Sequence, residues 1–139
     1  MKNAKKTMNV ALIAFVDLDG RILLNRRADA ASEMWEFIGG GIKTSETALE
    51  AIKREVTEEV GYRLNDKFDN LRFIESFDFE NERIIAKVHF FTASHPGVEH
   101  FSDSDETRVE DLHLFTVSEA LKHVLLPMSL AIINKGLLG

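Results

Sequence analysis

The sequence of 139 residues contains no cysteine. A chain without cysteine cannot form disulfides, bind zinc through thiolates or use a cysteine nucleophile. This absence is typical of proteins in a reducing compartment, and we expect a cytoplasmic location. Proline is also rare, with Pro96 and Pro127 the only two, so few predicted elements are interrupted.

Long hydrophobic runs are missing as well. No apolar stretch approaches the roughly 18 residues that cross a bilayer. The lysine-rich start and the apolar segment 8–16 superficially resemble a signal peptide. However, the turn-forming segment 17–20 follows instead of a small-residue cleavage site. We therefore expect no association with a membrane.

Positive charge is in deficit. The chain has 17 Lys and Arg against 23 Asp and Glu, which gives a net charge of −6. A mildly acidic protein has little general attraction for nucleic acid or anionic lipid, so we expect a small-molecule partner and no nucleic acid. The length and the lack of repeats or linkers predict a single domain over residues 1–139, as a monomer or homodimer.

Apolar and β-branched runs predict six strands, at 8–16, 21–25, 34–38, 71–79, 83–93 and 112–116. Turn signals at Asp19-Gly20 and at 80–82 indicate two hairpins. One helix is expected after the glycine run 39–41, and two more at 118–124 and 128–138. This order predicts an α+β fold, in the form of an α/β/α sandwich on a mixed sheet.

The helix after the glycine run carries the clearest pattern. Its expected N-cap is Thr44 or Ser45, and Gly61 is the expected C-terminal stop. Four apolar side chains recur at helical spacing and form the expected core stripe: Leu49, Ile52, Val56 and Val60.

Three glutamates share a different face of this helix. Glu55, Glu58 and Glu59 stand at i, i+3 and i+4. Like charges this close repel one another, and we expect no cationic side chain on that face to offset them. Oxygen ligands without sulfur or imidazole suit Mg²⁺ or Mn²⁺, so a divalent cation is the predicted partner. The alternative is an ordinary acidic face exposed to solvent.

Two neighbouring features favour the metal. The glycines at 39–41 allow the backbone to approach a phosphate or to offer a carbonyl to a metal. Arg54 lies one turn after Glu50 and two turns after Glu46, so it is placed to pair with either.

Together these positions resemble the Nudix box, the signature of the Nudix hydrolase family. The box spans residues 40–62 and includes Gly40, Glu46, Arg54-Glu55-Val56, Glu58-Glu59-Val60 and Gly61. The segment 34–40 resembles the tryptophan-to-diglycine strand of that family. Three positions depart from the usual pattern: Ile38 stands for proline, Ser45 for glycine and Tyr62 for an aliphatic residue.

The resemblance implies a reaction and a set of roles. The reaction is water attack on a diphosphate bridge, with Mg²⁺ or Mn²⁺ as cofactor. The implied metal ligands are Gly39, through its carbonyl, Glu55, Glu58 and Glu59, and Glu55 and Glu58 are also the implied catalytic glutamates of the box. The implied substrate contact of the box is Gly40, and the implied structural pair is Glu46 and Arg54.

A general base for the attacking water is also expected. In this family the base comes either from the box or from a loop beyond it. The loop predicted at 95–111 offers six carboxylates: Glu99, Asp103, Asp105, Glu106, Glu110 and Asp111. We favour Glu106, because its distance from the strand predicted at 112–116 is similar to that in MutT-like members. The alternatives are Glu55 on the helix, and six loop charges without a role.

The segment 24–30 resembles MutT-like nucleoside triphosphate hydrolases. Within it, Arg26 or Arg27 is placed to meet phosphates or a purine edge, with a plain surface role as the alternative. Trp35, Phe77 and Phe79 are candidates to stack on a base or to fill the core. The asparagine that reads an oxidised guanine in the best-known members is absent around 126–132. The alternatives are a nucleotide-sugar or ADP-ribose pyrophosphatase and a non-catalytic Nudix-fold nucleotide-binding module.

Overall fold

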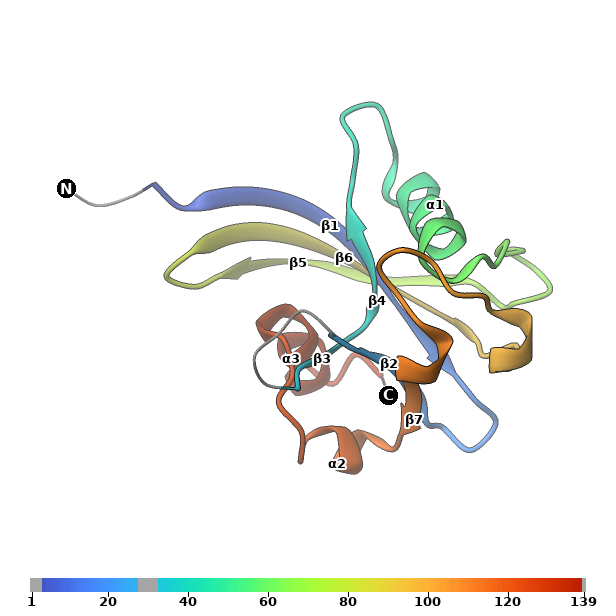
Figure 1. The fold of residues 1–139 in the computed structure, drawn as a ribbon. Helices are drawn as coiled ribbons and strands as arrows, with labels where there is room; N and C mark the ends of the chain where they lie inside the picture. The colour runs from blue at the N-terminus through green and yellow to red at the C-terminus, as the bar shows by residue number, and fades with distance from the viewer. Residues whose placement is uncertain (1–3, 28–32, 139) are drawn as a thin grey trace.

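Figure 1 shows the computed structural model of the chain, which describes residues 4–27 and 33–138. Within these residues the strands are β1 (Lys6–Val16), β2 (Ile22–Arg26), β3 (Trp35–Glu36), β4 (Ile38–Gly41), β5 (Arg72–Glu80), β6 (Ile84–Ser94) and β7 (Leu112–Phe115). The helices are α1 (Ala48–Val60), α2 (Val117–Ala120) and α3 (Pro127–Asn134), with short 3-10 helices η1 (Val98–His100) and η2 (Val109–Asp111). Most of the loop predicted at 27–33 lies outside the described residues.

One mixed sheet organises the molecule. Its strands follow the order β3-β2-β1-β6-β5, with β4 paired to β1 and β7 paired to β2. The pairing of β1 with β6 is parallel and runs from Lys6↔Ile84 to Val16↔Ser94. The β1–β2 and β5–β6 pairings are antiparallel and form the two predicted hairpins. The prediction of an α+β fold on a mixed sheet is therefore confirmed.

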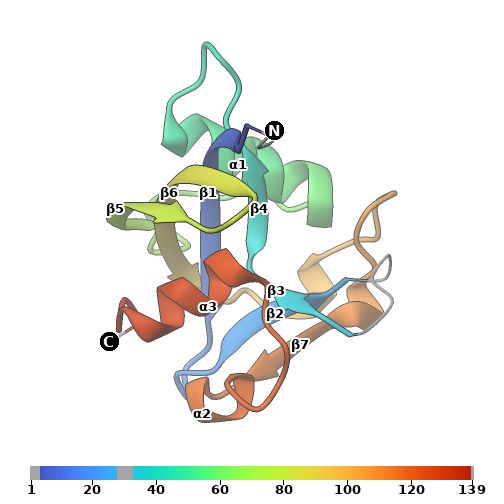
Figure 2. The same ribbon diagram turned by 90° about the vertical axis from the view of Figure 1, so that its left-hand side faces the viewer.

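Strand β1 is covered on both faces because its side chains alternate between two hydrophobic cores. Ala11, Ile13 and Phe15 pack in the cluster that includes the apolar side chains of α1. Leu12 and Ala14 pack in the cluster that includes those of α3. Figure 2 shows the resulting layers, with α3 in front of β1 and α1 behind it.

The strand predicted at 34–38 divides at Phe37 into β3 and β4. The glycine run belongs to β4, where Gly39 and Gly40 pair with Leu12 and Ala11 of β1. Gly39 has a φ of 146°, and a Cβ at this position would collide with the Ala11 carbonyl oxygen. The close approach of β4 to β1 therefore requires a glycine at position 39.

Helix α1 begins later than predicted. Its N-cap is Thr47, not Thr44 or Ser45, because Thr47 and Glu50 form a capping box in which each side chain binds the other residue's backbone N–H. The predicted stop is confirmed, since Gly61 has a φ of 67° and donates its N–H to the Thr57 carbonyl. The prediction that Leu49 belongs to the core is wrong, because this residue is 39% exposed. Ala51 is buried instead.

The C-terminal helices are shorter than predicted. The helix expected at 118–124 ends at Ala120, and the chain then forms a parallel bridge between Leu125 and Trp35. The helix expected at 128–138 begins at Pro127, where the missing N–H costs no hydrogen bond, and ends at Asn134. In residues 4–27 and 33–138, none of the helices has the length and apolar character needed to cross a bilayer.

Candidate active site

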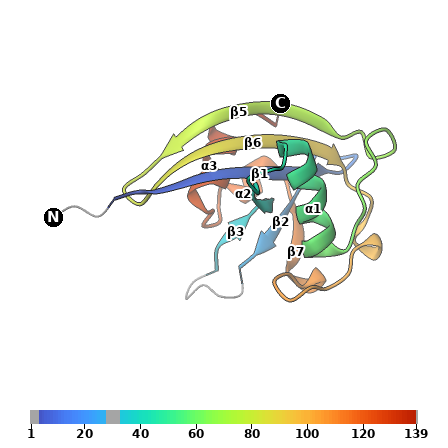
Figure 3. The same cartoon turned by 90° about the horizontal axis from the view of Figure 1, so that it is seen from above.

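The glycine strand and α1 meet at Glu55. Figure 3 shows α1 alongside β1. Strand β4 pairs with β1 and contacts α1. A Cβ at Gly40 would lie 2.7 Å from Glu55 Oε1 and 2.9 Å from Oε2. The Glu55 carboxylate therefore occupies the space that any other residue at position 40 would fill. This contact explains why the sequence has a glycine here, although Gly40 has no unusual φ.

Glu59 is anchored on the same strand. Its Oε2 accepts a hydrogen bond of 3.0 Å from the Gly39 N–H. Burial, reinforced by the nearby charge of Glu55, raises the pKa of Glu59 to about 8. Burial also raises the pKa of Glu55. Two adjacent, partly desolvated carboxylates are electrostatically unfavourable without a cation, so their environment suits a divalent ion.

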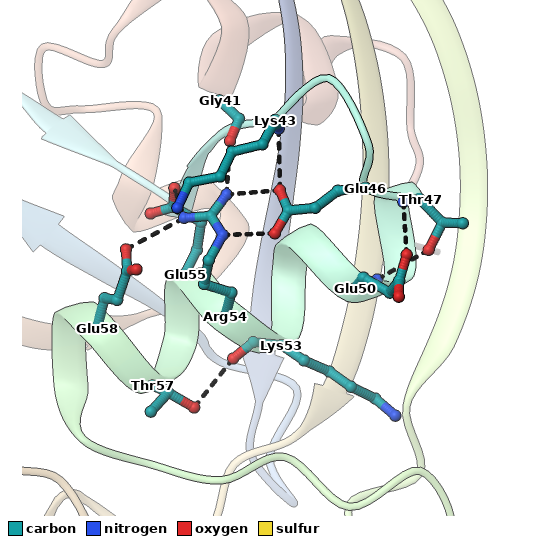
Figure 4. Close-up of polar contacts among 10 residues, drawn as sticks. All are labelled: Gly41, Lys43, Glu46, Thr47, Glu50, Lys53, Arg54, Glu55, Thr57 and Glu58. Atoms are coloured by element: carbon teal, nitrogen blue, oxygen red, sulfur yellow. Dashed lines mark hydrogen bonds and ion pairs between the residues drawn. The ribbon is translucent and has the colours of Figure 1, made fainter.

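Arg54 is the counter-ion of the cluster (Figure 4). Its Nη1 lies 3.0 Å from Glu55 Oε1 and 3.1 Å from Glu58 Oε2. The expectation that no cationic side chain offsets these glutamates is therefore wrong. The signal was present in the sequence, because Arg54 and Glu58 stand at i and i+4 on the helix.

The other edge of the Arg54 guanidinium holds the loop before α1. Nε and Nη2 bind the two oxygens of Glu46 at 2.6 Å and 2.8 Å, and Nη2 also donates to the Gly41 carbonyl. Glu46 accepts a further hydrogen bond from the Lys43 N–H, and these contacts lower its pKa to about 2. The choice between Glu46 and Glu50 is thus settled in favour of Glu46, since Glu50 caps the helix.

The three box glutamates are not gathered around one point. Glu58 instead contacts Arg54, and 55% of its side chain is exposed. Within the described ranges, no group of three or more His, Cys, Asp or Glu side chains is close enough together to hold a metal ion. Metal binding by these glutamates and the Gly39 carbonyl stays a prediction, as does the contact of Gly40 with substrate.

Glu106 is exposed on the loop between η1 and η2. Its charge contributes to the raised pKa of both Glu55 and Glu59, so it faces the helix glutamates. The backbone around it is held by Ser104 Oγ, which accepts from the N–H groups of Glu106 and Thr107. The position is compatible with a general base, and the role itself stays a prediction.

The two arginines at the end of β2 are ion-paired. Arg26 binds Asp111 Oδ1 through Nη2 at 2.5 Å and Nε at 3.1 Å, and it also binds Glu33 at 3.2 Å. Arg27 Nε lies 3.3 Å from Glu36 Oε2. Their contact with substrate stays a prediction, and Arg26 would have to share its guanidinium with Asp111.

Sequence reasoning missed two acidic residues. Asp111, treated only as one of six loop carboxylates, is buried and is the partner of Arg26. Glu36 was given no role, although its charge contributes to the raised pKa of Glu59. Its position directly after Trp35 on the short strand β3 was the available signal, because alternate residues of a strand face opposite sides.

The three candidate aromatic side chains serve mainly as core. Trp35 and Phe77 are buried, with 5% and 7% exposed, and Trp35 packs edge-on against Phe115. Phe79 is partly buried against the same cluster. Stacking of Trp35 or Phe77 on a base would therefore require them to leave the core.

A glycine strand, a tight loop and a helix with the box glutamates define a Nudix-type hydrolase. The NUDIX domain family model matches residues 5–133, and the chain belongs to this family. An RNA pyrophosphohydrolase from Halorhodospira halophila is 49% identical over 53 residues, which cover 38% of this chain and 28% of that protein. An oxidized purine nucleoside triphosphate hydrolase from Danio rerio is 30% identical over 105 residues, which cover 73% of this chain and 64% of that protein.

A solved structure supports the fold. The MutT protein from Methanosarcina mazei Go1 superposes with a TM-score of 0.73 at 18% identity, covering 98% of this chain and 96% of that one. The match with each of the two curated relatives spans less than two thirds of that relative's length.

Proposed function

We propose that the chain is a pyrophosphohydrolase of nucleoside triphosphates that uses Mg²⁺ or Mn²⁺, with residues 1–139 as one catalytic domain. One observation carries the proposal: the glycine strand positions two box glutamates. The Gly39 N–H binds Glu59, and the space over Gly40 holds the Glu55 carboxylate. Such a pair beside a close-approaching backbone suits a cation together with a phosphate.

The donor set fits the proposed metal. Glu55, Glu58 and Glu59 offer only oxygen ligands. Burial disfavours the ionised forms of Glu55 and Glu59 unless a cation is nearby. A bound Mg²⁺ would neutralise phosphate charge and lower the pKa of the attacking water. The ligand set would be completed by the Gly39 carbonyl.

Arg54 and Glu106 have separate roles in the proposed reaction. Arg54 holds Glu55 and the loop carboxylate Glu46 in fixed positions through opposite edges of one guanidinium. Glu106, on the loop, is the proposed acceptor of the water proton, because a carboxylate that is not a ligand keeps its basicity. Glu55 is the alternative acceptor.

The test is a panel of substrates in Mg²⁺ with identification of the products. A nucleoside triphosphate should give the monophosphate and diphosphate, and Glu58→Gln should lose this activity while Glu75→Gln, on the exposed edge strand β5, should keep it. A monophosphate and a sugar phosphate from a sugar conjugate would instead favour the nucleotide-sugar or ADP-ribose alternative. Tight nucleotide binding without any product would mean a non-catalytic module.

A second candidate substrate is the 5′-triphosphate end of RNA. It is favoured by the matches over 53 and 58 residues to two relatives named RNA pyrophosphohydrolase. The net charge of −6 offers little general attraction for RNA, which favours the free nucleotide. Comparing kcat/KM for a triphosphorylated RNA oligonucleotide and for free nucleoside triphosphates at two salt concentrations separates the two.

A further inference from the structure

A polar array crosses three adjacent strands away from the box glutamates. His89 of β6 lies between Ser76 of β5 and Asn9 of β1. Ser76 Oγ lies 2.6 Å from His89 Nδ1, and His89 Nε2 lies 3.0 Å from Asn9 Oδ1. Serine, histidine and an orienting amide in this order form the arrangement that activates a hydroxyl nucleophile.

The array fixes the histidine tautomer. The Asn9 Oδ1 atom can only accept a hydrogen bond, so His89 Nε2 must carry the proton. Burial, together with the charge of Lys87, lowers the pKa of His89, and the ring is therefore mostly neutral near pH 7. Nδ1 then presents a lone pair to the Ser76 hydroxyl, which is the role of a general base.

A cavity adjoins the hydroxyl. It has a volume of about 430 Å³ and is lined by Ser76 and His89 together with the apolar side chains of Leu49, Leu71, Phe73 and Phe91. Its size lies within the range of small-molecule sites. Leu49 and Phe73 are 39% and 56% exposed, so the apolar wall is accessible from solvent.

The first turn of α1 forms part of the same wall. Thr47, Ala48 and Leu49 line the cavity. The Glu50 N–H is bound by Thr47 Oγ1 and the Ala51 N–H by the Thr47 carbonyl. The N–H groups of Ala48 and Leu49 belong to the donors that a helix leaves without an intrahelical partner. They are the candidate donors to a developing oxyanion.

We propose that Ser76, His89 and Asn9 form a second catalytic site, which hydrolyses carboxylic esters with a short apolar acyl group. Ser76 Oγ attacks the carbonyl carbon while His89 Nδ1 takes its proton. The C–O bond to the alcohol then breaks, and the leaving alkoxide takes the proton from His89. Water reverses the sequence: His89 takes a water proton, hydroxide adds to the acyl carbon, and Ser76 Oγ leaves with the proton. Asn9 acts as a positioning residue.

The test uses p-nitrophenyl acetate in the presence of chelator, so its outcome is independent of the nucleotide activity. The parent protein should release a burst of p-nitrophenolate stoichiometric with the chain, and a fluorophosphonate probe should label Ser76, as located by peptide mass spectrometry. Ser76→Ala should lose both signals. The matched control Ser94→Ala, an exposed serine of β6, should keep them. His89→Gln should slow acylation by roughly 100-fold.

The role of Asn9 has a readout that does not depend on turnover. In the parent protein, ¹⁵N shifts of His89 should show the tautomer protonated at Nε2, and Asn9→Ala should mix the two tautomers while the circular dichroism stays unchanged. The proposal is overturned by a burst that survives in Ser76→Ala, by a label on another residue, or by a parent protein without burst or label. In any of these cases the array only stabilises the sheet.

Discussion

Arg54 makes the acidic helix face compatible with a folded chain in the absence of metal. Its side chain is only 20% exposed, and its guanidinium contacts three carboxylates. Partial burial strengthens such pairs relative to surface ones, whose contribution is small. The repulsion between Glu55 and Glu58 is therefore offset within the helix, and we expect the chain to fold without metal.

Gly40→Ala should lower the activity without unfolding the protein. The Cβ of Gly40→Ala would lie 2.7 Å from the end of the Glu55 side chain, which can move, so the fold should survive. The displaced carboxylate should lower kcat by roughly 100-fold, the scale expected for misplacement by about 1 Å. Gly41→Ala is the matched control, because a Cβ there meets nothing within 4 Å. Equal kcat in the two variants would contradict the contact.

Glu46 should contribute stability that depends on pH. Its pKa is about 2 in the folded chain against an ordinary value of 4.5. Because folding lowers the pKa of this carboxyl, its ionised form stabilises the folded state at pH values above the pKa of the unfolded chain. This contribution is lost as the pH falls from 4.5 toward 2. The urea midpoint of Glu46→Gln should therefore be lower than that of the parent near neutral pH, with the difference vanishing toward pH 2. Curves that stay parallel over this range would exclude the effect.

Glu106 should affect turnover without affecting metal binding. Glu106→Gln should lower kcat by about two orders of magnitude or more, because it removes the proposed proton acceptor. Glu110→Gln is the control and should behave like the parent, because Glu110 lies nearby in η2 and its carboxylate is 3.2 Å from Arg108. Metal titrations of kcat check the assignment. If Glu106→Gln is fully active and Glu55→Gln is inactive with intact metal binding, the base lies on the helix.

At the scale of elements, the start of α1 distinguishes the structure from the sequence prediction. Thr47→Ala removes the side-chain acceptor of the capping box and should destabilise the protein by about 1 kcal/mol. Ser45→Ala, at one of the two caps expected from the sequence, should leave the urea midpoint unchanged within error. The opposite ranking of the two variants would place the helix start at residue 45 or 46.

Periodicity and local signals predicted most elements because they report on neighbours in sequence. The strands, the stop at Gly61 and the box spacing follow from such signals. Contacts between distant segments were not accessible in this way: Arg26 and Asp111 are 85 residues apart, and only the β2–β7 pairing brings them together. The Thr47 cap was within reach of the sequence, because of Thr44, Ser45 and Thr47 only Thr47 has a glutamate three residues later, Glu50, which completes the capping box.

At the scale of the whole molecule, helix α1 borders both proposed sites. The box glutamates lie at the C-terminal half of α1, next to β4, whereas the Ser76 array adjoins the N-terminal turn of the same helix. Both depend on how α1 is seated on the sheet through Ile52 and Val56, which are fully buried. A core mutation under α1 should therefore impair both sites, whereas mutations in either site should leave the other intact.

Removal of the metal should abolish the nucleotide activity and leave the protein folded. Chelator should reduce turnover to background, and Mg²⁺ or Mn²⁺ should restore it, because the buried glutamates need a divalent charge to receive a polyanion. Mg²⁺ at 100 times its dissociation constant should stabilise the parent by about 2.7 kcal/mol. Glu58→Gln should lose this increment. Without metal its stability should match the parent within about 0.5 kcal/mol, because the Glu58 pair with Arg54 is exposed. Unfolding curves with chelator and with Mg²⁺ measure both effects, and turnover that persists in chelator would refute the metal requirement.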